Sequence, residues 1–225
     1  MTVEVAGVDG TPGGWVVALV GARGLVRWCR CATASEVLAA TTDAAAIGVD
    51  IPMGLMHSAP RAADAAARAL LGGARSSVFS APVRAVLDAP DYRSACERSR
   101  TALGKALSLQ SWHIVGKIAQ WDAVLTPELQ RRVVEVHPEL AFRRMAPEVR
   151  FTGKRTTRGV GQRIAALGGT VDILAALAEL PAATPMNDLL DALAAAWSAR
   201  RFAEGSAEIH GAELDPRGLT MRLVL

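Results

Sequence analysis

The sequence lacks any apolar run of about 18 residues, the length that a membrane-spanning helix needs, so we expect no membrane span. Its first ten residues, MTVEVAGVDG, lack the basic stretch followed by an apolar one that marks a secretory signal, which predicts a cytoplasmic location. Long blocks of like charge are also missing, and 51% of the 225 residues are apolar. This balance excludes a disordered chain and predicts a globular protein with one core.

Cysteine and lysine are both scarce. The chain has three cysteines, and Cys29 and Cys31 lack the spacing and the neighbouring ligands of a zinc site, so we expect buried thiols. Only three lysines stand beside 22 arginines, at a net charge of +3. Arginine suits phosphate binding, but in so alanine-rich a chain we attribute most of the excess to genome composition.

The first 52 residues have the pattern of a mixed sheet. Apolar runs at 3–8, 15–20 and 25–31, separated by glycine-rich turns, predict an antiparallel meander. SEVLAATTDA then predicts a helix with Ser35 as its N-cap. The run AAIGVDIP, which ends at a proline, predicts a buried fourth strand. A helical crossover to this strand predicts that it runs parallel to a neighbour.

The rest of the chain is mostly helical in pattern. Several helices are predicted from Met56 to about Glu128, where prolines interrupt an alanine- and arginine-rich stretch. RRVVEVHPELAF restores a strand pattern, and NDLLDALAAAWSARR has apolar residues at helical spacing. The final GAELDPRGLTMRLVL predicts a hairpin.

Two aspartates follow the first and fourth strands of this pattern. Asp9 ends the first strand and Asp50 ends the fourth. If the two strands are parallel neighbours, their ends lie about 4.8 Å apart, at the edge where open α/β sheets place their sites. Each acid alone has a structural explanation as a turn or strand end. Together they predict a site for a hard divalent cation, which relieves the repulsion between two carboxylates.

Three further acids are candidates for the same site. Asp188 and Asp191 share one face near the start of the late helix, where the helix dipole alone could also account for them. Glu135 lies within an apolar strand, where an ionised carboxylate is costly unless it is paired or bound to metal. An edge position would explain it equally well. We include all three as candidate catalytic residues.

Basic and hydroxyl side chains could hold the phosphates of a substrate near such a site. Pairing within one helix is the simpler explanation for those at 61–68, and binding of substrate phosphate is the functional one. The predicted substrate-binding residues are Arg61, Arg68, Arg75, Ser77, Lys154 and Arg158.

The chain resembles a family of bacterial and archaeal proteins of unknown function, domain of unknown function 429, described as predicted nucleases with a ribonuclease H-like fold. The resemblance rests on stretches that run in order from residue 7 to about 201. These are GVDGTPGGWVVA, GVDIPMGL, RAADAAARALLGGARSSVFSAP, EVHPELAF and DLLDALAAAWSARR. That family usually has an acid where this chain has Asn187.

The resemblance implies an α/β fold with a mixed five-stranded sheet, its first three strands antiparallel and its fourth parallel to the first. It also implies a single ribonuclease H-like domain over residues 1–225, with a helical insertion at about 56–129. Nucleases of that fold take their acids from the first strand, the fourth strand and the last core helix. Asp9, Asp50 and Asp188 or Asp191 occupy those places here.

We therefore expect a nuclease that hydrolyses DNA or RNA with two Mg²⁺ or Mn²⁺ ions, held by Asp9, Asp50, Asp188 and Asp191. DGTPGG also resembles the phosphate-binding hairpin of the sugar-kinase, heat-shock-chaperone and actin ATPases, which implies an ATP-dependent phosphotransferase as the alternative. A non-catalytic binding module is the third reading. The sequence leaves the oligomeric state open and is compatible with a homodimer.

Overall fold

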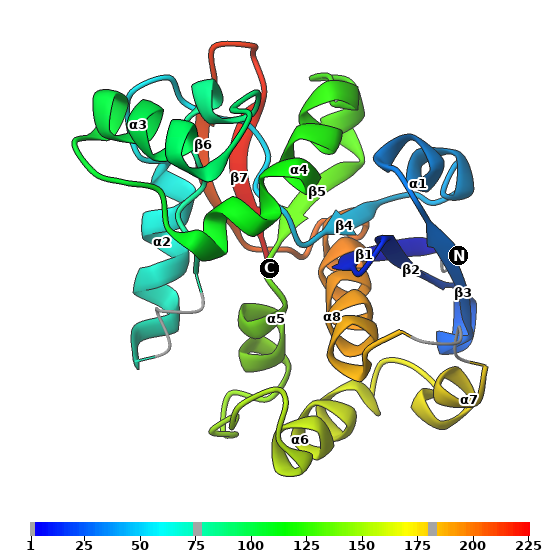
Figure 1. The fold of residues 1–225 in the computed structure, drawn as a ribbon. Helices are drawn as coiled ribbons and strands as arrows, with labels where there is room; N and C mark the ends of the chain where they lie inside the picture. The colour runs from blue at the N-terminus through cyan, green and yellow to red at the C-terminus, as the bar shows by residue number, and fades with distance from the viewer. Residues whose placement is uncertain (1–2, 74–77, 180–183) are drawn as a thin grey trace. The chain divides into compact units, whose positions relative to one another are not determined.

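The computed structural model describes residues 3–73, 78–179 and 184–225 (Figure 1). The chain divides into two compact units. The first unit comprises Met1–Asp50, Arg132–Glu208 and Val224–Leu225, and the second comprises Ile51–Arg131 and Ile209–Leu223. Within the described ranges, no helix has the length and apolar character needed to cross a membrane.

The first unit contains a mixed sheet. Its strands are β1 (Val5–Thr11), β2 (Gly14–Val20), β3 (Val26–Cys31), β4 (Ile47–Val49) and β5 (Val133–Val136). Their order is β3-β2-β1-β4-β5. β1 pairs antiparallel with β2, and β2 with β3, whereas β4 lies parallel to both β1 and β5. The predicted antiparallel meander followed by a parallel fourth strand is confirmed, and the mixed α/β sheet is compatible with a ribonuclease H-like fold.

Helix α1 (Ala34–Ala40) makes the predicted crossover between β3 and β4. The prediction of Ser35 as its N-cap was wrong by two residues. Thr33 is the N-cap, and its hydroxyl accepts a hydrogen bond from the Glu36 backbone N–H at 3.2 Å. The Glu36 carboxylate in turn accepts from the Ala32 N–H at 2.8 Å. This reciprocal pair satisfies two backbone donors, which Ser35 could not do from inside the helix.

Helix α8 packs closely on β1 because both surfaces are made of small residues. A Cβ atom on Gly7 would lie 1.9 Å from the carbonyl oxygen of Ala192, and one on Gly48 would lie 2.4 Å from that of Ala195. Only glycine therefore fits at these two points of the sheet. The other helices of this unit are α5 (Pro138–Met145), α6 (Thr157–Leu167) and α7 (Ile173–Ala178), and α8 itself spans Met186–Ala203 (Figure 1).

The second unit contains the helices predicted for about 56–129 and, in addition, the C-terminal hairpin. Its helices are α2 (Ala62–Leu71), α3 (Tyr92–Leu103) and α4 (Leu109–Val124). The predicted hairpin is confirmed as the neighbouring strands β6 (Ile209–Leu214) and β7 (Thr220–Val224). Seven strands are thus present in the described residues, two more than the five that the resemblance implied, because the C-terminal hairpin adds β6 and β7.

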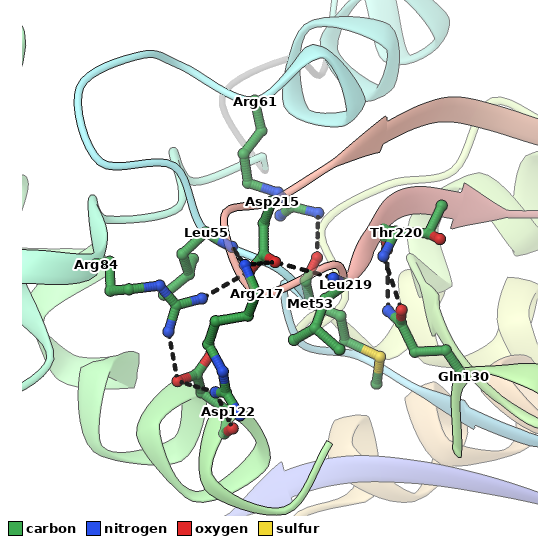
Figure 2. Close-up of polar contacts among 10 residues, drawn as sticks. All are labelled: Met53, Leu55, Arg61, Arg84, Asp122, Gln130, Asp215, Arg217, Leu219 and Thr220. Atoms are coloured by element: carbon green, nitrogen blue, oxygen red, sulfur yellow. Dashed lines mark hydrogen bonds and ion pairs between the residues drawn. The ribbon is translucent and has the colours of Figure 1, made fainter. Parts of the chain in front are cut away.

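A buried polar network joins this hairpin to the helical part of the second unit (Figure 2). The Asp215 carboxylate accepts from Arg84 Nη2 at 2.6 Å and from three backbone N–H groups, those of Leu55, Arg217 and Leu219, at 2.8–3.1 Å. Burial opposes ionisation of Asp215, but these hydrogen bonds outweigh it and lower its pKa. One carboxylate therefore ties together segments that lie far apart in the sequence.

We predict that Asp215→Ala lowers the free energy of unfolding by about 3 kcal/mol or more, because it leaves Arg84 and the buried N–H groups of Leu55 and Leu219 without this acceptor. Urea unfolding followed by circular dichroism measures the change. The matched control is Asp88→Ala, which also removes the partner of an arginine, Arg98, but at an exposed position. It should cost less than about 1 kcal/mol. Equal losses in the two variants would contradict a stabilising role for the Asp215 network.

Candidate functional site: a cluster of buried aspartates

Asp9 and Asp50 lie at the same end of two neighbouring parallel strands. Val8 of β1 is in register with Val49 of β4, so both aspartates directly follow this parallel pair. The prediction that Asp9 ends the first strand was wrong by two residues, because the antiparallel pairing with β2 continues β1 to Thr11. The Asp50 N–H also donates to the carbonyl of Val8 at 3.0 Å, which continues the ladder to the position of the acids. The first and fourth strands are thus parallel neighbours, the condition under which Asp9 and Asp50 were predicted to lie side by side.

Both aspartates face helix α8. Side chains alternate between the two faces of a strand, and Gly7 and Gly48, two residues before Asp9 and Asp50, face α8 at close range. Ala192 of α8 lies over Gly7, so the turn before it, which carries Asp188 and Asp191, lies toward Asp9. The exposed fractions of Asp9, Asp188 and Asp191 are 8%, 7% and 1%. Four acids from three elements therefore share one largely buried region.

The pKa values of Asp9, Asp50 and Asp191 are raised above the ordinary value of an aspartate. Burial is the largest cause of the raised pKa of Asp9, and the negative charges of Asp191, Asp50 and Asp188 raise it further. Burial likewise raises the pKa of Asp50 and of Asp191 to about 6 in each case, although the charge of Lys154 acts in the opposite direction. Additional positive charge at this cluster would stabilise the ionised carboxylates.

Lys154 supplies the positive charge that the structure holds at the cluster. It lies in the loop between α5 and α6, and its Nζ donates to Asp191 Oδ2 at 2.6 Å. Burial lowers the pKa of Lys154, but the charges of Asp191, Asp50 and Asp9 outweigh it and raise the pKa overall. Asp191 Oδ1 is buried and has no hydrogen-bond partner among the described residues. One carboxylate oxygen is thus available to a further cation.

Glu139 and Arg163 are two neighbours of the cluster that the sequence reasoning missed. Besides burial, the charge of Glu139, in the first turn of α5, raises the pKa of both Asp50 and Asp191. Arg163 of α6 binds Glu139 through two bonds of 2.6 and 2.8 Å. Its other terminal nitrogen donates to the carbonyls of Thr152 and Gly159, on either side of Lys154. The sequence signal for Glu139 is an acid in the first helical turn after a buried strand.

Glu135 is not brought to the aspartates. Glu135 is in register with Val49 of β4, and Val49 is in register with Val8 of β1. These three residues each follow a position that faces α8, so their side chains point to the other face of the sheet. Glu135 is buried, but on the opposite face of the sheet from Asp9 and Asp50. An acid in a strand beside the site therefore points away from it when it lies one residue before or after a position that faces α8.

The predicted phosphate-binding residues have different surroundings. Arg61 donates to Asp64 and to the carbonyl of Met53, and Arg68 donates to the hydroxyl of Ser80, all within the second unit. The bond from Arg61 to Asp64 agrees with the simpler explanation, pairing along the helix, whereas Arg68 has its partner outside α2. Of the others, Lys154 is at the aspartate cluster, Arg158 is exposed in the first turn of α6, and Arg75 and Ser77 lie outside the described residues.

The donor chemistry of the cluster fits Mg²⁺ or Mn²⁺, which prefer oxygen ligands. The raised pKa values of Asp9, Asp50 and Asp191 and the unpartnered oxygen of Asp191 are the features that support this fit. Within the described parts of the chain, no set of three or more histidine, cysteine, aspartate or glutamate side chains is already arranged around a metal position. The bond from Lys154 holds one oxygen of Asp191 instead.

Comparison with known proteins places the chain in one family. A family model described as "Protein of unknown function (DUF429)" matches residues 7–215, so the chain belongs to this family. The family resemblance inferred from the sequence is confirmed by this match. The comparisons with curated proteins and with solved structures gave no match.

Proposed function

We propose that this protein is a metal-dependent nuclease that hydrolyses phosphodiester bonds of DNA or RNA. The observation that carries the proposal is the convergence of four aspartates from β1, the end of β4 and α8 in one buried region. A protein that only needed a stable fold would avoid this arrangement, because mutual repulsion and burial disfavour the ionised acids. A site that binds divalent cations requires it.

Asp9, Asp50, Asp188 and Asp191 would hold two Mg²⁺ or Mn²⁺ ions. When bound, such ions supply an activated water and charge stabilisation for an in-line phosphoryl displacement. Gly7 and Gly48 serve the site indirectly, because they let α8 approach the sheet closely enough to bring its two aspartates toward Asp9. The geometry of the cluster is thus set by residues that carry no chemistry of their own.

Lys154 is the basic residue best placed to contact a substrate phosphate. Its side chain is 41% exposed while its ammonium contacts Asp191, so it faces both the acids and solvent. Arg163 of α6 holds the loop that carries Lys154 by donating to the carbonyl of Thr152, two residues before it. Arg158, exposed at the start of α6, can add a second phosphate contact. We propose the cytoplasm as the location, and nucleic acid as the partner.

A cleavage assay tests the proposal. Purified protein is incubated with end-labelled single-stranded and duplex DNA and RNA, with Mn²⁺, with Mg²⁺ or with EDTA. We expect cleavage of at least one substrate with either metal, complete loss in EDTA and recovery when metal is added back. Cleavage that persists in EDTA would contradict the metal role. ATP hydrolysis with every nucleic acid left intact would favour the phosphotransferase alternative, and no Mn²⁺ binding by calorimetry would favour the non-catalytic one.

A further inference from the structure

A cavity of about 690 Å³ lies in the first unit, at the C-terminal half of α8. Its polar part includes three arginines, Arg23, Arg200 and Arg201. Among its apolar lining side chains Trp197 is half-buried, whereas Val20, Leu193 and Ala196 are at most 2% exposed and offer a ligand little surface. Its volume falls within the range of small-molecule sites, which is about 300–1,000 Å³. None of the residues proposed for the nuclease site lines it.

This cavity lies at the other end of the β1–β2 ladder from the aspartates. Val20, in its wall, pairs with Val5 at the start of β1, whereas Asp9 pairs with Val16. The Val5–Val20 pair and the Asp9–Val16 pair are four positions apart along β1, which corresponds to about 13 Å. Along α8, nine residues from Asp191 to Arg200 correspond to about 13 Å as well. A ligand in the cavity would therefore not contact the acids directly.

Two of the arginines are held in place by backbone carbonyls. Arg200 Nη2 donates to the carbonyls of Val20 and Gly21 at 2.9 and 3.1 Å. The guanidinium of Arg201 lies 5.0 Å from the ring centre of Trp197, and its Nη2 donates to the carbonyl of Ser206 at 2.5 Å. A guanidinium has five N–H donors, so these bonds orient the groups and leave donors for an anion.

Arg23 has an unusual backbone for an arginine. Its φ of +63° lies in the left-handed region, and it is the sole non-glycine residue with a positive φ in the described chain. Such a conformation costs about 1 kcal/mol or more for a residue with a Cβ, and glycine or asparagine would adopt it more cheaply. Strain of this kind persists where a side chain has a use. Here that side chain belongs to the cavity wall.

The charge balance of the cavity favours an anion. Its lining contains the three arginines and two carboxylates, those of Asp172 and Glu204. The Asp172 carboxylate already accepts the Ala175 N–H as the N-cap of α7. A purely apolar ligand would bury the arginines without a partner, and a small inorganic anion would leave the half-buried ring of Trp197 uncovered.

From these features we propose that the cavity binds a small organic anion of about the size of a nucleoside monophosphate. Its phosphate would bind the arginines, and its ring system would pack against the half-buried ring of Trp197. The site is separate from the proposed nuclease centre, so it can be tested whether or not the protein cleaves nucleic acid.

Isothermal titration of AMP into the full-length protein in EDTA tests the proposal, with adenosine and inorganic phosphate as the two part-ligands. We expect AMP to bind at least about tenfold more tightly than either part. Adenosine binding as tight as that of AMP would contradict the role of the arginines. Phosphate binding as tight as that of AMP would contradict the role of Trp197, and no binding of AMP would overturn the proposal.

Two variants locate the binding. Gly169 lines the cavity, whereas Gly161 does not, and a Cβ on Gly169 meets no atom within 4 Å, so the fold should tolerate Gly169→Leu. A leucine at this point of the lining should weaken AMP binding at least about tenfold. Arg23→Gly should weaken it too, without lowering the melting temperature, because glycine accepts the positive φ. Gly161→Leu, at an exposed position of α6 with open space around it, is the control and should bind AMP normally. Unchanged affinity in Gly169→Leu would place AMP elsewhere and overturn the proposal.

Discussion

Replacing Asp9 with asparagine is expected to lower Mn²⁺-dependent cleavage by about a thousandfold or more. The residue carries the carboxylate whose pKa is raised by burial and then by the three other aspartates, so it lies among all of them. Asparagine keeps the shape of the side chain but removes the charge that a divalent cation needs. A metal ion contributes several kcal/mol of charge stabilisation, which corresponds to a factor of this size. Single-turnover cleavage with wild-type and variant protein measures it.

The same substitution should leave the fold intact. In EDTA, Asp9→Asn is expected to melt at a temperature no lower than that of the wild type, because it removes one of several buried acids that repel each other. Asp43→Asn, an exposed acid after α1, is the control for loss of one negative charge and should cleave normally. Wild-type cleavage by Asp9→Asn would remove this residue from the mechanism.

Glu135→Gln gives a sharper comparison, because Glu135 is also a buried acid of the same sheet. It lies on the face away from α8, so the structure predicts that the variant keeps its Mn²⁺-dependent cleavage. A loss as large as that of Asp9→Asn would contradict the face assignment. It would support the sequence-based expectation that Glu135 is catalytic.

Gly7→Ala is expected to lower the free energy of unfolding by about 3 kcal/mol or more and to weaken Mn²⁺ binding. The added Cβ would lie 1.9 Å from the carbonyl oxygen of Ala192 and 2.2 Å from the nitrogen of Ala196. These are backbone atoms, so α8 itself must move, and overpacking of this kind is costly. The displaced helix would carry Asp188 and Asp191 away from Asp9.

Urea unfolding and Mn²⁺ calorimetry measure the two effects of Gly7→Ala. Gly161→Ala is the control, because this glycine is exposed in α6 and a Cβ there meets no atom within 4 Å. It should leave Mn²⁺ binding unchanged and stabilise the protein by up to about 1 kcal/mol. If Gly7→Ala behaves like this control, the close approach of α8 does not set the site.

The strands and the late helix could be predicted from the sequence because their signals are local. Apolar runs bounded by glycine-rich turns marked β1 and β2, an apolar run that ends at a proline marked β4, and helical spacing marked α8. The alternation of side chains along a strand is also predictable from the sequence, and it places Glu135 on the opposite face from Val134 and Val136. Which face carries α8 was not predictable, because it depends on the register between β4 and β5.

Contacts between segments that are far apart in the chain could not be predicted from the sequence. Nothing local to Lys154 indicates that it binds Asp191, which lies 37 residues further along the chain. The bond from Arg84 to Asp215 spans 131 residues and assigns the C-terminal hairpin to the same unit as the predicted insertion. Residue types at fixed spacing predict elements, whereas these bonds depend on how the elements pack.

Crystals of the wild-type protein soaked in Mn²⁺ test the central claim most directly. The anomalous difference map should show two ions within about 4 Å of each other, bound by Asp9, Asp50 and at least one of Asp188 and Asp191. A map without anomalous density at these carboxylates, with Lys154 still bound to Asp191, would contradict the account.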